Sequence, residues 1–220
     1  MSQGGNSMKR IVKKPEERRI EIITVAKGLF SSNGYENTTV NDIIKKVGVA
    51  KGTFYHYFKS KDEIADAVIQ DSIDSSVQLF KQIINNPDLK AIEKFISIIQ
   101  FFSQETSNHF SDGLMTHLHH KDNVLLHQKM KVGMIKEYAP IISSVVKQGV
   151  EEGVFHTNFP DEITEFLLVG LHFMLDPSLF SLTHEQLIAK LDAIDEIYEK
   201  LLGAPKGSFP SIKQYFEKLY

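Results

Sequence analysis

The chain has 220 residues, of which 42% are hydrophobic and 24% are charged, and its formal net charge is −3. This composition is sufficient for a buried core, and no run approaches the ~20 consecutive apolar residues of a membrane span. Because the sequence has no cysteine, disulfides, thiolate metal sites and a cysteine nucleophile are excluded.

Charge is distributed unevenly along the chain. Residues 1–61 contain 12 Lys and Arg against 5 Asp and Glu, whereas residues 62–220 contain 13 against 23. A basic segment neutralises phosphates and supplies most sequence-independent affinity for DNA. The start of the chain lacks the apolar stretch of a secretory signal, so we expect a cytoplasmic protein. The expected order is a flexible basic tail (1–14), a basic head (15–61) and an acidic body (62–204).

Helical periodicity dominates, and we expect an all-α protein. Pro15 is suited to the first turn of a helix that ends at the Asn33-Gly34 pair, since glycine tolerates the left-handed conformation of a helix end. Thr38 or Thr39 caps a second helix, Gly48 lies in the following turn, and a third helix ends near residue 57.

Turn signals divide the rest of the chain into six more helices and a C-terminal segment. Ser60 and Glu63 form the capping box of a fourth helix, which runs toward residue 85. The remaining helices are expected at about 89–105, 108–119, 123–152 with Pro140 inside, 160–176 and 183–203. Residues 205–220 are expected to form a linker and a short terminal helix.

The third helix has two faces. Phe54 and Phe58 are four residues apart and therefore share an inward face. That leaves Lys51, Thr53, Tyr55 and His56 pointing outward, and Gly52 allows its backbone to approach another molecule closely. Aromatic, basic and hydroxyl side chains on one exposed helix are typical of a helix that enters a DNA major groove.

Residues 26–30, 34–35, 38–44, 47–58 and 61–63 together resemble the N-terminal domain of the TetR family of transcriptional regulators. The resemblance covers about residues 16–65. It implies a three-helix helix-turn-helix domain followed by a larger helical domain for ligand binding and dimerisation. Matched to the family's pattern, the DNA-contacting residues are Thr39, Lys51, Gly52, Thr53, Tyr55, His56, Tyr57 and Lys61. Thr39, Tyr57 and Lys61 match phosphate-contacting positions, although Tyr57 is also suited to packing against the first helix.

One recognition helix reads too few bases, so a dimer that reads a near-palindrome is expected. The helix at 160–176 is apolar nearly all round and the helix at 183–203 carries an apolar stripe, so the pair is suited to a dimer interface, as in the family. An intramolecular core is the alternative. The candidate interface residues are Phe166, Gly170, Phe173, Met174, Leu187, Leu191, Ile194 and Tyr198.

The resemblance also implies a pocket for a small-molecule effector in the body. Aromatic and methionine side chains with a few polar groups suit a largely apolar ligand. Ordinary core packing is the alternative for each residue. The candidate lining residues are Phe101, Phe102, His109, Phe110, Met115, Met134, Tyr138 and His172.

Four histidines, His117, His119, His120 and His127, invite comparison with a metal site. No cysteine or acidic residue stands at a convincing ligand spacing, and first-row metals require three or four convergent ligands. We therefore expect a polar helix end there, and neither a metal nor another cofactor.

The sequence thus predicts a dimeric, ligand-responsive transcriptional regulator, most simply a repressor released from its operator by an effector. Activator action stays open. One alternative is a DNA-binding adaptor without a ligand. A helical enzyme is a weaker alternative, because the sequence has no nucleophile elbow, no phosphate-binding glycine loop and no His-Glu-x-x-His motif.

Overall fold

The computed structural model describes residues 14–111, 124–176, 179–180 and 182–209, without the side chains of 103–111 and 124–126. All regular structure in these ranges is α-helical, which confirms the expected fold class. Most of the predicted basic tail and sixth helix, and the predicted terminal helix, lie outside the described residues. None of the helices described is both long and apolar enough to cross a bilayer.

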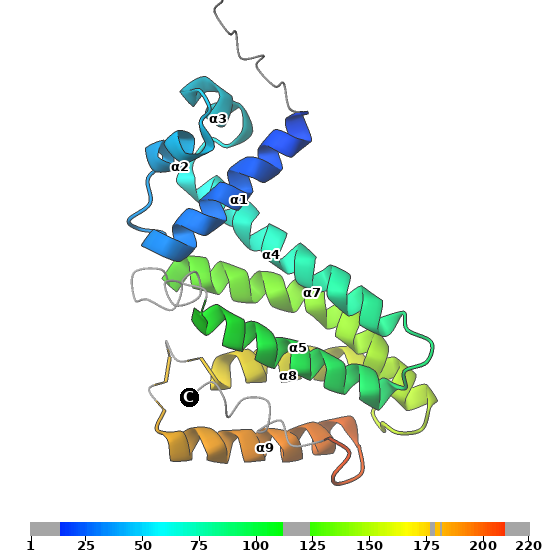
Figure 1. Cartoon of the computed structure of the whole chain (residues 1–220). Helices are drawn as coiled ribbons and strands as arrows, with labels where there is room; N and C mark the ends of the chain where they lie inside the picture. The colour runs from blue at the N-terminus through cyan, green and yellow to red at the C-terminus, as the bar shows by residue number, and fades with distance from the viewer. Residues whose placement is uncertain (1–13, 112–123, 177–178, 181, 210–220) are drawn as a thin grey trace, which may run out of the picture.

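Three helices form the head at one end of the molecule (Figure 1): α1 (Pro15–Asn33), α2 (Val40–Val47) and α3 (Lys51–Tyr57). The predicted start and end signals of α1 are confirmed: Pro15 stands in the first turn, and the Gly34 N–H bonds to the Phe30 carbonyl at 3.0 Å. The fourth helix, α4 (Lys61–Ile84), begins in the head and runs into the body. Ser60 is its N-cap as predicted, because the Ser60 hydroxyl accepts the Glu63 N–H at 3.1 Å. The other half of the predicted capping box is not formed, since the Glu63 carboxylate accepts the N–H of Lys59.

The body contains α5 (Ala91–Ser111), α7 (Val124–Glu151), α8 (Pro160–Met174) and α9 (His184–Leu202). The prediction that one helix ends near residue 105 and another begins near 108 was wrong, since α5 continues through these positions to Ser111. Thr, Ser and Asn are weaker in helices than in caps but do not end one by themselves. α7 likewise continues through Pro140.

Two separate hydrophobic cores hold the molecule together, one in the head and one in the body. The head core contains Phe30, Ile43 and Phe54, and it also takes Val68 from α4 and Met130 from α7. In the body, α7 packs against α4, α5 and α8, and α9 packs against α8. The predicted domain boundary at residue 61 stays a prediction, because α4 and α7 contribute side chains to both cores. The packing makes these two helices the structural connection between the parts.

Candidate nucleic-acid interface and effector cavity

Thr39 is the N-cap of α2. Its hydroxyl oxygen accepts the Asp42 N–H at 3.2 Å, and the Asp42 carboxylate accepts the Thr39 N–H at 2.9 Å. The hydroxyl also donates to this carboxylate at 2.6 Å. These bonds, first that from the Thr39 side chain and then that from its backbone, hold the pKa of Asp42 below its usual value. The predicted phosphate contact of Thr39 therefore requires the helix N-terminal N–H groups or a turn of the hydroxyl away from Asp42.

The turn between α2 and α3 is tight because Gly48 adopts a left-handed conformation, with φ +75°. Its N–H bonds to the Ile44 carbonyl at 3.0 Å and ends α2. Two residues later Ala50 is the N-cap of α3, and its carbonyl accepts the Thr53 N–H at 2.9 Å. This geometry turns α3 sharply away from α2, as in a helix-turn-helix motif.

The predicted faces of α3 are both found. Phe54 and Phe58 are 0% and 1% exposed, and their ring centroids lie 6.0 Å apart. Lys51, Gly52, Tyr55 and His56 are exposed on the other side, and Thr53 is half-buried. The Lys51 ammonium lies 5.9 Å from the centroid of the Tyr55 ring, so a cation and an aromatic face share one surface.

Tyr57 and Lys61 differ from the outward residues of α3. Tyr57 is half-buried and packs against the head core. Lys61 stands at the start of α4, where its ammonium lies 4.1 Å from the Tyr35 ring centroid and donates to the Glu36 carbonyl at 3.3 Å. Burial, and then the hydrogen bond to Asp62, raise the pKa of Tyr35. Tyr35 thus stays a neutral platform beneath the Lys61 charge.

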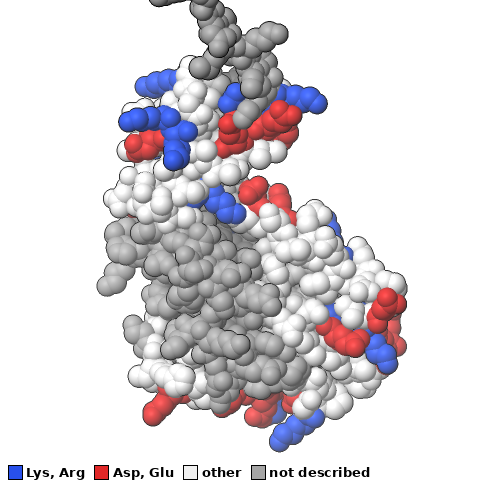
Figure 2. Space-filling view, in the orientation of Figure 1, with Lys and Arg blue, Asp and Glu red and all other residues white. Residues whose placement is uncertain are grey.

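Lys59 is a cation of the same surface that sequence reasoning did not single out. It is exposed, follows Phe58 directly, and its ammonium donates to the Tyr55 carbonyl at 3.1 Å. Its position two residues before Lys61 was the available signal. Lys45 and Lys46, in the last turn of α2, are exposed as well. Figure 2 shows Lys and Arg side chains gathered around the head, with acidic groups beside them.

In the body, four of the candidate effector residues come together. Phe80 lies at their centre, with ring centroids of Phe101, Phe102 and Tyr138 at 4.9, 5.4 and 4.9 Å. The His172 ring lies 5.7 Å from that of Phe102. Met134 packs against both cores. The side chains of His109 and Phe110, and all of Met115, lie outside the described residues.

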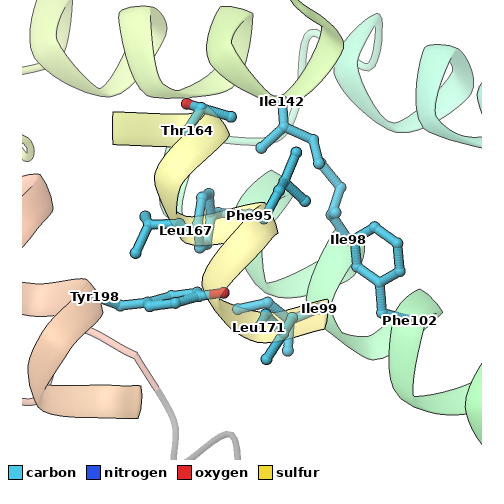
Figure 3. A pocket seen from close by; sticks show the side chains of 10 residues that line it. Phe95, Ile98, Ile99, Phe102, Ile142, Thr164, Leu167, Leu171 and Tyr198 are labelled. Atoms are coloured by element: carbon cyan, nitrogen blue, oxygen red, sulfur yellow. The ribbon is translucent and has the colours of Figure 1, made fainter. Parts of the chain in front are cut away.

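An apolar cavity lies between α5, α7, α8 and α9 (Figure 3). Its volume is about 30 Å³, room for a water molecule or two and far below the ~300–1,000 Å³ of ligand pockets. Burial raises the pKa of Tyr198, so the hydroxyl in this wall is neutral. The lining residues are Phe95, Ile98, Ile99, Phe102, Ile142, Thr164, Leu167, Leu168, Leu171 and Tyr198.

A second hollow is a surface groove of about 390 Å³ between α4 and α5. Phe101 lines it, together with Leu79, Ile83 and several amide side chains. Phe101 and Phe102 therefore contact the same Phe80 ring but face different spaces. Of the proposed effector residues whose side chains the structure describes, Phe102 is the one that lines the inner cavity.

The candidate interface residues separate into two groups. Leu187, Leu191, Ile194 and Tyr198 are at most 5% exposed and belong to the body core, so they lack the surface that contact with a second chain requires. The stripe on α9 faces inward because α8 covers it. Phe166 is 65% exposed, and Gly170, Phe173 and Met174 are partly exposed. The structure adds Val169 and Ile197 as exposed apolar side chains on α8 and α9.

Among the described residues, no three His, Asp or Glu side chains are grouped as a metal site requires. His117, His119 and His120 lie outside the described residues. His127 is buried in the body, with Nε2 3.9 Å from the Asp176 carboxylate. The expectation of no metal at residues 117–120 therefore stays a prediction.

Taken together, a tight turn and an exposed basic and aromatic helix on a small core are the features of a helix-turn-helix DNA-binding protein. Comparison with known families supports this class. The profile described as "Bacterial regulatory proteins, tetR family" matches residues 22–68, and "Tetracyclin repressor-like, C-terminal domain" matches residues 106–197. The chain belongs to the TetR family of transcriptional regulators and is a transcription factor, not an enzyme.

Similar proteins are regulators as well. The fatty acid metabolism regulator protein of Bacillus subtilis (strain 168) is 26% identical over 160 residues, which cover 72% of this chain and 81% of the relative. The HTH-type transcriptional repressor KstR2 of Mycolicibacterium smegmatis is 35% identical over 71 residues, 32% of this chain and 35% of the relative. Reduced E. coli NemR has the same fold, with a TM-score of 0.56 and 19% identity over 88% of this chain and 98% of that one.

Proposed function

We propose that this chain acts in the cytoplasm as a dimeric repressor that binds a near-palindromic operator through α3 and is released by a largely apolar small molecule. The outward face of α3, with its buried anchors Phe54 and Phe58, is the observation that carries the proposal. Lys51 and Thr53 are assigned to base edges, because a lysine donates to guanine acceptors and a threonine methyl contacts a thymine methyl.

The remaining candidates are assigned to the DNA backbone, which positions the head without specifying sequence. Tyr55 and His56 extend the α3 surface, Gly52 admits the DNA backbone, and Tyr57, Lys61 and the α2 N-terminus at Thr39 flank it. Two heads must then lie one helical turn apart, about 34–36 Å, to read both halves of a palindrome. That spacing is the quantity that an effector would change.

Selection of bound sequences from a random duplex pool, followed by fluorescence anisotropy over a salt series, tests the DNA-binding role. Tyr55→Ala and Lys61→Ala should each weaken binding at least about fivefold, and Lys61→Ala should also lower the salt dependence because it removes a phosphate contact. Lys200→Ala, an exposed change at the far end of α9, is the control. Salt-independent binding, or wild-type binding by both head variants, would overturn the assignment.

Support for a ligand comes from the position of the inner cavity. It lies between four helices of the body, and α7 is common to the cavity and the head core. The Bacillus subtilis relative is named for fatty acid metabolism, which agrees with an effector that has a hydrocarbon part. An effector releases DNA only to the extent that it binds the non-binding conformation more tightly.

A DNA-binding adaptor without a ligand is the second candidate, and one observation favours it. The cavity of about 30 Å³ would have to grow at least tenfold in volume to admit a typical small molecule. Screening a metabolite set for release of the selected operator separates the two functions. An adaptor would retain DNA with every compound, whereas the ligand-responsive repressor releases it with at least one.

A further inference from the structure

A buried ion pair connects α7 to the residue that follows the end of α8. The Lys131 ammonium on α7 bonds to the Asp176 carboxylate, and the two side chains are 6% and 1% exposed. His127, one turn earlier on α7, lies with Nε2 3.9 Å from the same carboxylate. The Lys131 ammonium also lies 4.3 Å from the Phe173 ring centroid. Such a pair is costly to bury and adds little net stability, so its presence calls for another explanation.

The ion pair is connected to the apolar cavity through His172. Phe102 lines the cavity and contacts the His172 ring, with the centroids 5.7 Å apart. Leu171 lines the cavity as well and precedes His172 in α8. The His172 ring lies close enough to Lys131 and Asp176 for the charges of both to act on it. Figure 3 shows Phe102 and Leu171 at the end of the cavity away from Thr164. An opening between these two side chains would therefore lead toward the charged groups.

We infer that Lys131 binds the carboxylate of an amphipathic effector whose hydrocarbon part fills the enlarged cavity, and that Asp176 occupies this position in the absence of the effector. The inference rests on the proposed ligand-responsive function and gives its effector a chemical class. The ligand is then an anion with an apolar chain.

An anionic head group is favoured over a cationic one because of where the two members of the ion pair stand. Asp176 follows the end of α8, so its side chain can leave without breaking a helix, whereas Lys131 lies within α7. Exchange of one carboxylate for another keeps the buried ammonium paired, and an unpaired buried charge is strongly unfavourable.

The same turn of α7 contacts the head. Lys129 forms an ion pair with Asp66 of α4 at 2.8 Å, and Met130 belongs to the head core. Lys131 follows directly. If the exchange of carboxylates at Lys131 displaces α7, the contacts of Lys129 and Met130 would therefore shift α4 and the head as well. An effector bound at Lys131 would thus contact the two conformations of the protein differently, and this difference in affinity is what shifts their populations.

The test uses matched probes on the full chain. Octanoate, decanoate and dodecanoate are compared with the alcohols of the same chain length by titration calorimetry, and release of the selected operator is followed by anisotropy. We expect each carboxylate to bind at least about tenfold more tightly than its alcohol, because it replaces a buried charge partner. In Lys131→Met the preference should fall below about twofold while alcohol binding is retained. Lys136→Met, an exposed change on the same helix, should keep the preference.

Asp176→Asn gives the opposite signature. It leaves Lys131 without its carboxylate, so decanoate should bind more tightly than to wild type and should raise the melting temperature of the variant by more. If that variant does not fold, the pair Lys131→Met with Asp176→Asn removes both charges and is expected to fold, since neutral replacements of buried ion pairs are tolerated. It should bind decanol at least as well as decanoate.

Equal affinity of wild type for carboxylates and alcohols, a preference that survives Lys131→Met, or no binding of any carboxylate would each overturn the inference. These outcomes are separable from failure of the proposed function. Release of DNA by alcohols and carboxylates alike keeps the ligand-responsive repressor and removes the anion site. Lys131-dependent binding without release of DNA keeps the anion site and removes the regulation.

Discussion

Two glycines of the head, Gly48 and Gly52, differ in whether their backbone conformation needs a glycine. Gly48 holds φ +75° in the turn, a conformation that costs an L-residue about 1–2 kcal/mol. Gly52 is helical and exposed in α3, and a Cβ there would meet nothing within 4 Å. Gly48→Ala should therefore destabilise the protein by about 1 kcal/mol, whereas Gly52→Ala should stabilise it by about 0.5–1 kcal/mol. Urea unfolding of the two variants measures both effects.

The same pair tests the predicted close approach of DNA to Gly52. Gly52→Ala should weaken operator binding although it stabilises the fold, because its new methyl lies on the exposed side of α3 that is proposed to contact DNA. A variant that is more stable and binds DNA as well as wild type would show that no DNA atom comes near this position.

His172 makes stability depend on pH. Burial, the larger effect, and the nearby Lys131 charge lower the pKa of His172 below its ordinary 6.5, against the opposing effect of its bond to the Leu168 carbonyl. As pH falls from about 7.5 to about 5.5, the unfolded chain binds a proton at this residue that the folded chain resists, so the free energy of unfolding decreases. His172→Phe should lose less stability over this interval than wild type. Denaturant unfolding at the two pH values measures the difference, and parallel losses would contradict it.

At the residue scale, the exposed face of α3 was predictable because the Phe54 and Phe58 spacing assigns the two faces of the helix. The burial of Tyr57 was left open, since a tyrosine beside a turn can either contact a phosphate or pack against the first helix. The ion pair of Lys131 and Asp176 was not foreseen. Its partners are 45 residues apart, and no local pattern indicates which lysine of α7 faces the core.

At the level of helices, α4 and α7 cross at a close contact. A Cβ added to Gly133 of α7 would lie 2.8 Å from Cδ1 of Ile73 in α4. Because Ile73 is 2% exposed and its end methyl has no open space to turn into, Gly133→Val should destabilise the protein by about 1–3 kcal/mol through overpacking. Gly28→Val in α1, where a Cβ meets nothing within 4 Å, is the control and should change stability by less than about 0.5 kcal/mol.

A second substitution identifies the cause. Ile73→Ala alone should cost about 2–5 kcal/mol by leaving a cavity, but combined with Gly133→Val it should cost less than the sum, because the valine fills that space. Additive losses in thermal and urea unfolding would mean that the two residues do not share one contact.

Helix positions were largely predictable because caps and turns are local: Ser60, Thr183 and Pro160 all begin helices where the sequence indicated. Helix faces were less so. The sequence favoured a dimer interface for the stripe on α9 and left an intramolecular core as the alternative, and Leu187 and Leu191 pack into the body core. Periodicity shows that a helix has an apolar face, and tertiary packing decides what covers it.

For the whole molecule, the surface of α8 and α9 is the strongest candidate for dimerisation. Phe166 is 65% exposed and Val169 is 41% exposed, and three residues apart they share one face of α8. Ile197 is exposed on α9, which packs against α8. Phe166→Glu should raise the dimer dissociation constant by more than about tenfold, because it places a charge in an apolar contact.

Loss of the dimer should also weaken binding to a full-site DNA duplex. Sedimentation equilibrium of Phe166→Glu measures self-association, and anisotropy on half-site and full-site duplexes measures binding. The variant should retain half-site affinity, because the head is untouched, and lose the extra affinity for the full site that two linked heads provide. Leu79→Glu, which charges an exposed residue on α4, is the matched control. A dimer as strong as wild type in Phe166→Glu would move the interface away from α8, and equal loss in both variants would show that exposed charge alone disturbs assembly.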